Sequence, residues 1–221
     1  MKKILGLISI VLCSMSAAVL TSCLSTDGDD GGIDPTTYKN WLVKLAGNYY
    51  GDPSSWKTTN KVYFYNDTIT GSNKTDSIEG VEMRMGTDST LVVYGMPGRI
   101  ITKSIKDNDE LKEAIENAAS PLLKAKYILY NPQTNYISYL VYPYEMEYTN
   151  VNYKGGNHNV KVKFYLPTGG AWATQNGKSQ TAANFCIEGL YLDGTKVKSI
   201  YDNLDTSTAQ SNSVFQVFVT R

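Results

Sequence analysis

The spacing of apolar residues divides the chain into an N-terminal apolar run and a longer patterned region. Residues 4–20 form an uncharged apolar run directly after Lys2 and Lys3, which is the pattern of a secretory leader. From residue 34 onward, apolar positions recur with the spacing of helices or strands. The pattern predicts a leader over residues 1–22 and one globular domain over residues 34–221.

Two segments of the domain have the spacing of amphipathic helices. The first starts at Asp34, a favourable N-cap residue, and ends before Gly47. The second starts at Asp107 and Glu110, which resemble a capping box. The apolar faces comprise Tyr38, Trp41, Leu42 and Leu45 in the first helix and Leu111, Ala114, Ile115 and Ala118 in the second.

The remaining pattern is that of short strands separated by Gly, Asn and Asp. Val160, Val162 and Phe164 alternate with charged residues, as in a strand with one buried face. The predicted strands cover residues 62–65, 78–85, 91–94, 126–130, 136–142, 144–153, 160–166, 185–192, 197–201 and 214–220. Roughly ten strands with short connections predict a mainly β fold, an antiparallel barrel or sandwich, with one short N-terminal helix and one mid-chain helix.

The end of the leader contains two cleavage patterns. Residues 16–18, Ser-Ala-Ala, resemble the site of an ordinary signal peptidase. Residues 20–23, Leu-Thr-Ser-Cys, resemble the lipobox of bacterial lipoproteins, in which Cys23 becomes the lipidated first residue. We favour the lipobox because Cys23 directly follows the apolar run and precedes a polar stretch. An uncleaved transmembrane anchor is the alternative, since the run is at the lower length limit of a membrane span.

Residues 23–33 form a polar tether between the lipidated cysteine and the domain. Their glycine-rich composition gives a flexible coil with a root-mean-square reach of about 15–20 Å. Acidic residues after a lipidated cysteine resemble the surface-export signal of Bacteroidetes lipoproteins. The chain is therefore expected in the outer membrane and exposed at the cell surface, and a periplasm-facing spacer is the alternative. The tether is not an EF-hand, because Gly31 and Tyr38 occupy ligand positions.

The segment after the first predicted helix carries a family resemblance. Residues 45–51 read Leu-Ala-Gly-Asn-Tyr-Tyr-Gly, and this motif behind a lipobox resembles small envelope lipoproteins of gut Bacteroidetes, many of them lipocalin-like. The resemblance implies a cell-envelope location and a calycin-type barrel, and it implies no catalytic residues. The predicted mid-chain helix departs from a plain lipocalin and puts a closed barrel in doubt.

Composition restricts the partners and the redox chemistry. Lys and Arg number 21, as do Asp and Glu, and loss of Lys2 and Lys3 with the leader leaves a net charge of −2. This balance excludes nucleic acid as a general partner. The 17 Tyr against 5 Phe favour sheet. Only Cys186 stays unmodified in the domain, so no intramolecular disulfide is expected and the thiol is expected to be buried.

The usual catalytic patterns are missing. His158 is the only histidine, which excludes a multi-histidine metal site, and we expect it in an exposed turn without a role. Residues 177–179, Gly-Lys-Ser, lack the earlier glycine of a phosphate-binding loop, since Trp172 occupies that position. Glu145 and Glu147 would share a strand face, where a glycosidase pair or an ordinary solvated pair fits. We therefore expect no enzyme, no cofactor and no metal.

Two tryptophans are the strongest sequence indication of binding. Trp56 and Trp172 lie in predicted loops, where they could stack on sugars, fill a ligand mouth or simply pack over the barrel ends. The leading hypothesis is a non-enzymatic, envelope-anchored binding lipoprotein for a glycan or a small apolar ligand. The alternative is a structural or assembly protein that docks onto another envelope protein. The first predicts both rings on one concave surface, and the second predicts an apolar patch or a free strand edge.

Three short segments resemble the Asp-(Ser/Thr)-apolar acceptor pattern for protein O-glycosylation in Bacteroidetes. The acceptor residues would be Thr68, Ser77 and Ser89. The same triplets are ordinary turn-to-strand sequences, so both interpretations stay open.

The lipobox leads to a direct prediction. Growth of the native host with a labelled fatty acid should label the wild-type protein, and Cys23→Ala should abolish that label because the acylated thiol is gone. Equal labelling of the two proteins, measured after gel separation, would exclude Cys23 as the anchor.

Overall fold

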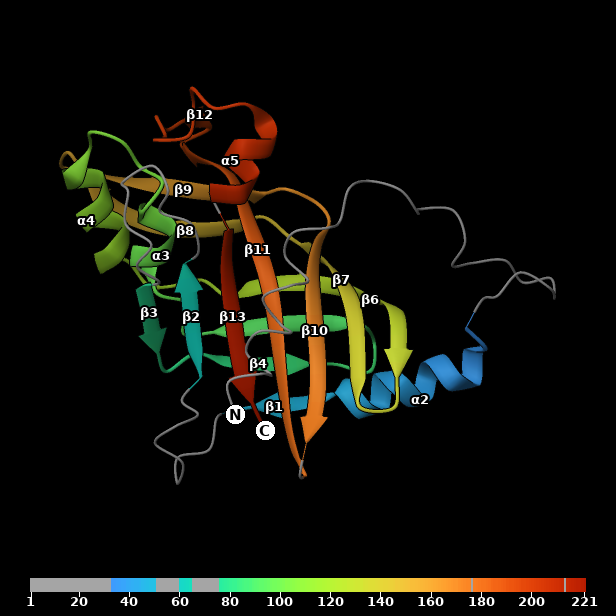
Figure 1. The fold of residues 1–221 in the computed structure, drawn as a ribbon. Coiled ribbons are helices and arrows are strands. Elements are labelled where there is room, and N and C mark those ends of the chain that lie inside the picture. The colour runs from blue at the N-terminus through green and yellow to red at the C-terminus, as the bar shows by residue number, and fades with distance from the viewer. Residues whose placement is uncertain (1–32, 51–59, 65–75, 176, 213) are drawn as a thin grey trace.

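The computed structural model describes residues 33–50, 60–64, 76–175, 177–212 and 214–221. Within these ranges the chain is mainly antiparallel β-sheet, with helices packed at its ends (Figure 1). The helices are α2 (Pro35–Leu45), α3 (Gly98–Thr102), α4 (Asp109–Asn117) and α5 (Thr206–Asn212). The strands are β1 (Gly47–Tyr49), β2 (Lys61–Phe64), β3 (Asp76–Glu79), β4 (Glu82–Met85), β5 (Thr90–Tyr94), β6 (Leu123–Gln133), β7 (Tyr136–Pro143), β8 (Met146–Tyr153), β9 (Gly156–Phe164), β10 (Thr168–Gln175), β11 (Lys178–Leu192), β12 (Thr195–Lys196) and β13 (Val214–Thr220).

The sheet is strongly curved but is not closed by hydrogen-bonded strands. Its order is β1-β4-β5-β6-β7-β10-β11-β13-β2-β3, so β1 and β3 end the path. The long strand β11 pairs first with β10 and β13 and then, beyond a bulge between Ile187 and Gly189, with β9. As a result β4 and β5 run behind and across β13, β11 and β10, and β8 and β9 lie above them (Figure 1).

Helix α2 covers one end of the curved sheet (Figure 1). The Asp34 carboxylate caps it by accepting the Thr37 N–H at 2.8 Å, as the sequence predicts. Leu42 and Leu45 are buried beneath it. The Tyr38 hydroxyl accepts the backbone N–H of Leu129 at 3.3 Å, on the edge of β6 that is beyond the end of its pairing with β5. The helix therefore supplies an acceptor where β5 no longer does.

Side-chain contacts join the β1 region to the end of β13, and Arg221 makes most of them. Its guanidinium donates to the carbonyl of Ala46 at 2.5 Å and to that of Lys44 at 3.0 Å. The same group lies 5.0 Å from the centre of the Tyr49 ring, a cation–π contact. These contacts tie the C-terminal end of α2 to the last residue of the chain.

Asn60 makes a second joint beside Arg221. Its buried amide donates to the Tyr49 carbonyl at 2.8 Å and accepts the Thr220 N–H at 2.8 Å. One side chain thus bridges β1 and β13, which do not pair with each other. The two joints satisfy backbone groups that would otherwise be buried without partners.

Large aromatic side chains fill the concave side of the sheet. Phe185 and Phe215 stack with ring centres 5.3 Å apart, and Phe164 meets both edge-on. Fully buried tyrosines occupy the rest of the interior: Tyr49, Tyr127, Tyr139 and Tyr148. The tyrosine-rich composition therefore builds the core itself.

The predicted mainly antiparallel β fold is confirmed, as are both predicted helices, although Asn108 rather than Asp107 caps the second. The expected strand 78–85 is two strands, because Gly80 with φ +88° turns the chain between them. Residues 197–201 do not form a strand: Ser199 makes an isolated bridge with Ile105, and residues 200 and 201 lie in a turn. Strands β1, β10 and β12 and the short helices α3 and α5 were not predicted. Within the described ranges, no helix has the length and apolar character needed to cross a membrane.

We predict that a side chain at position 47 destabilises the protein, because Arg221 lies against Gly47. Its φ is +147°, and an added Cβ would overlap the Arg221 guanidinium. Gly47→Ala should lower the free energy of unfolding by about 2–3 kcal/mol, which lowers the melting temperature by about 4–12 °C at this chain length. Gly155→Ala is the control, because Gly155 has φ +76° with no atom near its Cβ position. Equal destabilisation of the two variants, measured by thermal unfolding, would mean that the overlap is unimportant.

Candidate functional site

Trp172 is not presented to a ligand. It lies on β10 opposite Ile137, faces the interior and is 2% exposed. The prediction of a loop at this position was wrong, because residues 168–192 form the β10–β11 hairpin. Trp56 lies outside the described residues, so the prediction that the two rings share one concave surface is not tested.

Two buried polar atoms of the interior lack hydrogen-bond partners among the described residues, the Tyr148 hydroxyl and the Trp172 indole nitrogen. Burial raises the pKa of Tyr148 far above its usual value and that of Tyr49 to about 12. The Trp172 indole N–H lies close to the Tyr49 hydroxyl and slightly opposes the increase in the pKa of Tyr49. The two groups do not have the geometry of a hydrogen bond. Among the described residues, the buried side chains of the interior include no Asp, Glu, Lys, Arg or His.

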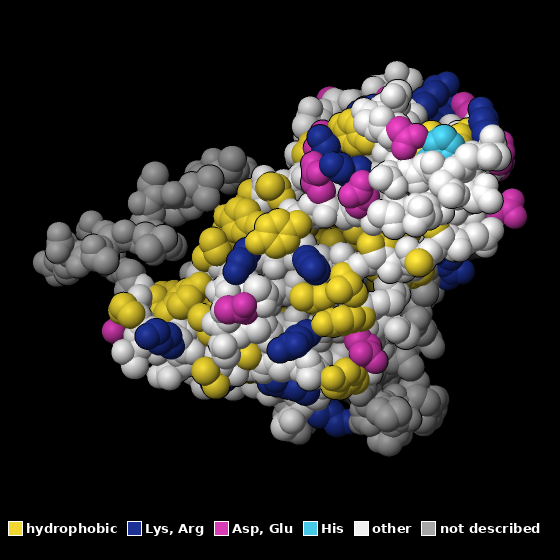
Figure 2. Space-filling model, turned by 180° about the vertical axis from the view of Figure 1, so that it is seen from behind, with side chains coloured by type: hydrophobic (Ala, Val, Ile, Leu, Met, Phe, Trp, Pro, Cys, Tyr) yellow, Lys and Arg dark blue, Asp and Glu magenta, His cyan; other side chains and the backbone are white. Residues whose placement is uncertain are grey.

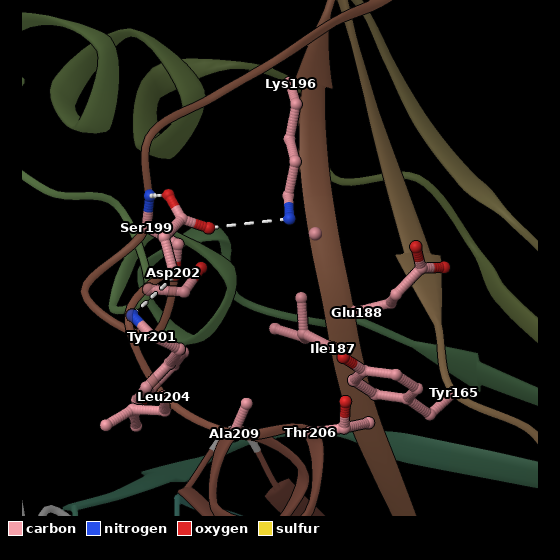
Figure 3. A pocket seen from close by; sticks show the side chains of 12 residues that line it. Tyr165, Ile187, Glu188, Lys196, Ser199, Tyr201, Asp202, Leu204, Thr206 and Ala209 are labelled. Atoms are coloured by element: carbon pink, nitrogen blue, oxygen red, sulfur yellow. Dashed lines mark hydrogen bonds and ion pairs between the residues drawn. The ribbon is translucent and has the colours of Figure 1, made fainter.

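A small polar cavity of about 120 Å³ lies far from α2, near β12 and α5 (Figures 1 and 3). We call it the distal pocket. On one wall the Lys196 ammonium lies 3.4 Å from the Asp202 carboxylate. The second oxygen of Asp202 accepts the Ser199 N–H at 2.7 Å. The Lys196 ammonium and the Asp202 carboxylate therefore already form an ion pair with each other.

The opposite wall of the distal pocket is strand β11 at its bulge. The bulge turns the Glu188 carboxylate away from Lys196 (Figure 3). Gly189 permits the close approach of Lys196, because a Cβ there would lie 3.1 Å from the Lys196 Cε. Burial raises the pKa of Tyr165, which also lines the cavity. A cavity of this volume holds a few water molecules and is smaller than ordinary ligand pockets of about 300–1,000 Å³.

His158 is held on β9 rather than exposed in a turn. Its Nδ1 lies 2.6 Å from an Asp193 carboxylate oxygen, and its Nε2 lies 3.0 Å from the Tyr153 carbonyl. The expected exposed turn position was wrong, because the ring is half-buried on β9 against Asp193, a residue 35 positions away in the sequence. Cys186 is buried, as predicted, and its thiol donates to the Gln210 carbonyl at 3.0 Å. The thiol and the imidazole therefore have separate structural partners.

Of the two carboxylates Glu145 and Glu147, Glu145 forms ion pairs at the surface. Glu145 lies 3.2 Å from the Lys161 ammonium and 3.7 Å from that of Lys163. The hydrogen bond and charge of Lys161, helped by Lys163, hold the pKa of Glu145 below its usual value. Glu147 faces Lys161 in the β8–β9 ladder. Among the described residues, no cluster of His, Cys, Asp and Glu could hold a metal ion.

The convex surface of β5, β6 and β7 is unusually rich in tyrosine and aliphatic side chains. The strand registers bring these residues side by side, with Val92 opposite Lys124, Lys126 opposite Tyr142 and Ile128 opposite Leu140. We call this surface the outer face, and it comprises Val92, Tyr94, Lys124, Lys126, Ile128, Leu140, Tyr142 and Tyr144. Figure 2 shows apolar side chains gathered on this side of the molecule, with lysine and arginine between them.

Exposure along the outer face is high for such side chains. Tyr144 is 51% exposed, Ile128 40% and Tyr94 37%. The alternate residues of β5 and β6, such as Val93 and Tyr127, are completely buried in the interior. The sequence analysis did not predict the outer face, although the alternation of residues 136–144 indicates it. Both sets of alternating positions there are apolar, so the solvent side of the strand is apolar too.

The charges of the outer face are concentrated on its central strand. Lys124 and Lys126 lie on β6. Tyr94 of β5 lies on one side of them, and Tyr142 and Tyr144 at the end of β7 lie on the other. Lys126 donates to the Asp88 carbonyl at 3.2 Å. Lys124 and Arg84, which faces Val92 from β4, have no ion-pair partner among the described residues. The only exposed acids beside them on β4 and its turn are Glu82 and Asp88.

Ser89, one predicted glycosylation acceptor, lies half-exposed in the β4–β5 turn with φ +62°. The Asp88 carboxylate accepts the Thr90 N–H at 3.2 Å and its hydroxyl at 2.5 Å, as in an ordinary turn. Ser77 lies on β3, and its side chain is outside the described structure, as are Thr68 and the lipidation residue Cys23. Glycosylation and lipidation stay predictions.

Comparison with known families gives one result. The model of the family described as Domain of unknown function (DUF4840) matches residues 44–192, about two thirds of the chain. No curated protein and no solved structure matches the chain. The matched segment contains β1 to β11 in full, and with them the whole outer face.

The buried tyrosines give a matched test of the interior. Tyr148→Phe should leave the free energy of unfolding unchanged or raise it by about 1 kcal/mol, because its hydroxyl is buried without a partner. Tyr139→Phe should lower it by about 1–3 kcal/mol, because the Tyr139 hydroxyl lies 2.7 Å from that of Thr181 and donates to the Ala182 carbonyl. Urea unfolding of both variants measures the difference. A loss in Tyr148→Phe as large as that in Tyr139→Phe would show that Tyr148 has an unseen partner.

Proposed function

The chain belongs to the DUF4840 family, and we propose that it is an envelope-anchored, non-enzymatic lipoprotein that binds a glycan chain on its outer face. The observation that supports this proposal is the exposure of Tyr94 and Tyr144, with the half-buried Tyr142 beside them, around two lysines of the central strand. The packed interior favours an external ligand over a small apolar molecule inside the sheet. The small, internally paired distal pocket has no room for a sugar chain.

Tyrosine and lysine together match the chemistry of a sugar chain. A tyrosine ring offers an apolar face and a polar hydroxyl, and a sugar ring likewise has C–H faces and hydroxyl groups. Lys124 and Lys126 add donors for hydroxyl or acidic groups of the sugar. Because the outer face is built from adjacent extended strands, it presents a platform rather than a closed cavity, which suits an extended chain.

The lysines also weigh against an ordinary protein interface. Lysine is depleted at protein–protein interfaces, whose centres are apolar and aromatic. In the outer face, Lys124 and Lys126 occupy the central strand. A protein partner would have to remove both ammonium groups from water or pair them with acids, and ion pairs of this kind contribute little net affinity.

The predicted anchor leaves the outer face accessible. The described chain starts at residue 33, next to the N-cap of α2, so a lipid on Cys23 would attach the domain through its α2 end. The outer face runs along the side of the sheet, and the distal pocket lies far from α2 (Figure 1). An extended glycan can therefore approach the outer face without displacing the anchor.

Docking onto another envelope protein is the second candidate, and one observation favours it. Leu122 and Leu166, which border β6 and β10, are 44% and 58% exposed. Aliphatic side chains of this size gain little from a sugar but much from an apolar protein surface.

Thermal unfolding with a glycan panel tests the proposal. The mature chain carrying Cys23→Ala would be melted with purified neutral and acidic oligosaccharides. A ligand at about 100 times its dissociation constant adds about 2.7 kcal/mol and raises the melting temperature by about 5–11 °C. Tyr144→Ala and Tyr142→Ala should each remove that shift.

Tyr191→Ala is the matched control, because Tyr191 is also a half-exposed strand tyrosine but lies on β11 beneath Lys163. The shift should persist in this variant. A panel without any shift at millimolar concentrations would contradict glycan binding and favour docking. Cross-linking in the native envelope would then be expected to join the wild-type protein to a partner protein. The Leu122→Asp variant should form no such cross-linked product.

A further inference from the structure

Two hairpin turns lie side by side at one end of strand β9. The β8–β9 turn contains Lys154 and Gly155, and the β11–β12 turn contains Asp193 and Gly194, all with positive φ. Strand β9 pairs with β8 on one side and with β11 on the other, and Val160 faces Leu192. The register therefore brings Asp193 next to Asn159, and the two exchange backbone and side-chain hydrogen bonds at 3.0 and 2.9 Å.

The His158 ring connects both turns through two acceptors. Nδ1 faces the Asp193 carboxylate at 2.6 Å, and Nε2 faces the Tyr153 carbonyl at 3.0 Å. Neither a carboxylate nor a carbonyl can donate. A neutral imidazole carries only one N–H, so only the doubly protonated ring can make both contacts.

The groups around the ring favour this charged form. Asp193 is the carboxylate that faces it, and the hydrogen bonds from Asn159 and His158 hold the pKa of Asp193 below its usual value. From β8, the Tyr153 ring meets the His158 ring edge-on, with ring centres 5.9 Å apart. The Lys154 ammonium lies over the Tyr153 ring, 5.2 Å from its centre. Asn108, the N-cap residue of α4, donates a hydrogen bond to the Tyr153 hydroxyl. The histidine side chain is 27% exposed, so protons can reach it.

We propose that His158 is a pH-dependent latch between the two turns, and that its protonation state controls the wall of the distal pocket. With both nitrogens protonated, the ring ties the β11–β12 turn to the β8–β9 turn. Loss of one proton breaks one of the two contacts. Strand β12 directly follows Asp193 and Gly194 and carries Lys196, whose ammonium faces Asp202 across the distal pocket. A loosened turn therefore loosens that wall.

The sign of the pH dependence follows from the two titrating groups. The histidine contribution is present when both ring nitrogens are protonated and is lost when rising pH removes one of these protons. The Asp193 contribution is present when the carboxylate is charged and is lost as the pH falls through its lowered pKa. The latch is accordingly closed in mildly acidic solution and opens on alkalisation.

Hydrogen exchange followed by NMR tests the latch. The chain has one histidine, so the ring nitrogen signals report His158 alone and show directly when both nitrogens are protonated. The Val197 N–H donates to the Leu190 carbonyl at 2.8 Å across the β11–β12 hairpin. Its protection factor should fall about threefold to fivefold between pH 5.5 and pH 8, the size expected for a partly exposed ion pair. Amides of the β6–β7 hairpin should not change.

His158→Gln is the control variant, because the amide keeps a donor but does not titrate. Its Val197 protection should be low and independent of pH. A wild-type protection factor that is the same at both pH values would overturn the latch, as would an unchanged pH dependence in His158→Gln. A pH effect confined to residues 153–159 would overturn the control of the distal pocket.

Discussion

The fold depends on how the first strand of an open, curved sheet is joined to the last strand of the chain. Strands β1 and β13 share no ladder, and the Arg221 guanidinium and the Asn60 amide bridge them instead. Arg221 reaches the carbonyls at the end of α2 only because Gly47 has no side chain. The same joint places Tyr49 under the guanidinium, where its hydroxyl donates to the Leu45 carbonyl at 2.7 Å. Helix α2, the first strand and the last strand are thereby fixed as one unit, and α2 can cover the end of the sheet.

Closing that end with α2 has a consequence for function. Tyrosine and phenylalanine rings then fill the concave side, and the Trp172 ring is used for packing rather than recognition. Tyrosine also occurs on the convex side, where Tyr94 and Tyr144 are open to solvent beside Lys124 and Lys126. The two sides of one sheet therefore differ: the concave side is packed with buried rings, and the convex side exposes tyrosine and lysine to solvent. This difference is the basis for proposing an external glycan ligand.

Local patterns predicted the fold class and the two main helices. The Asp34 cap and the alternation of Val160, Val162 and Phe164 need only neighbouring residues, and both are found as expected. Strand β10 could not be predicted, because glycines at 169 and 170 disfavour strands, and the Tyr139 ring that explains Gly170 belongs to a distant strand. The contacts of His158 were equally hidden, since Asp193 is distant in sequence. Of the candidate binding residues, only the outer face has a recoverable signal, the apolar solvent side of residues 136–144.

Mapping of the bound ligand by NMR tests the central claim most directly. Backbone amide shifts of the mature Cys23→Ala chain would be followed during titration with whichever oligosaccharide stabilises it. The account predicts that the largest changes fall on β5, β6 and β7, at residues 90–94, 123–130 and 138–144, with the distal pocket unaffected. Changes concentrated at residues 187–204, or spread through the buried core around Phe185 and Phe215, would contradict an external binding face.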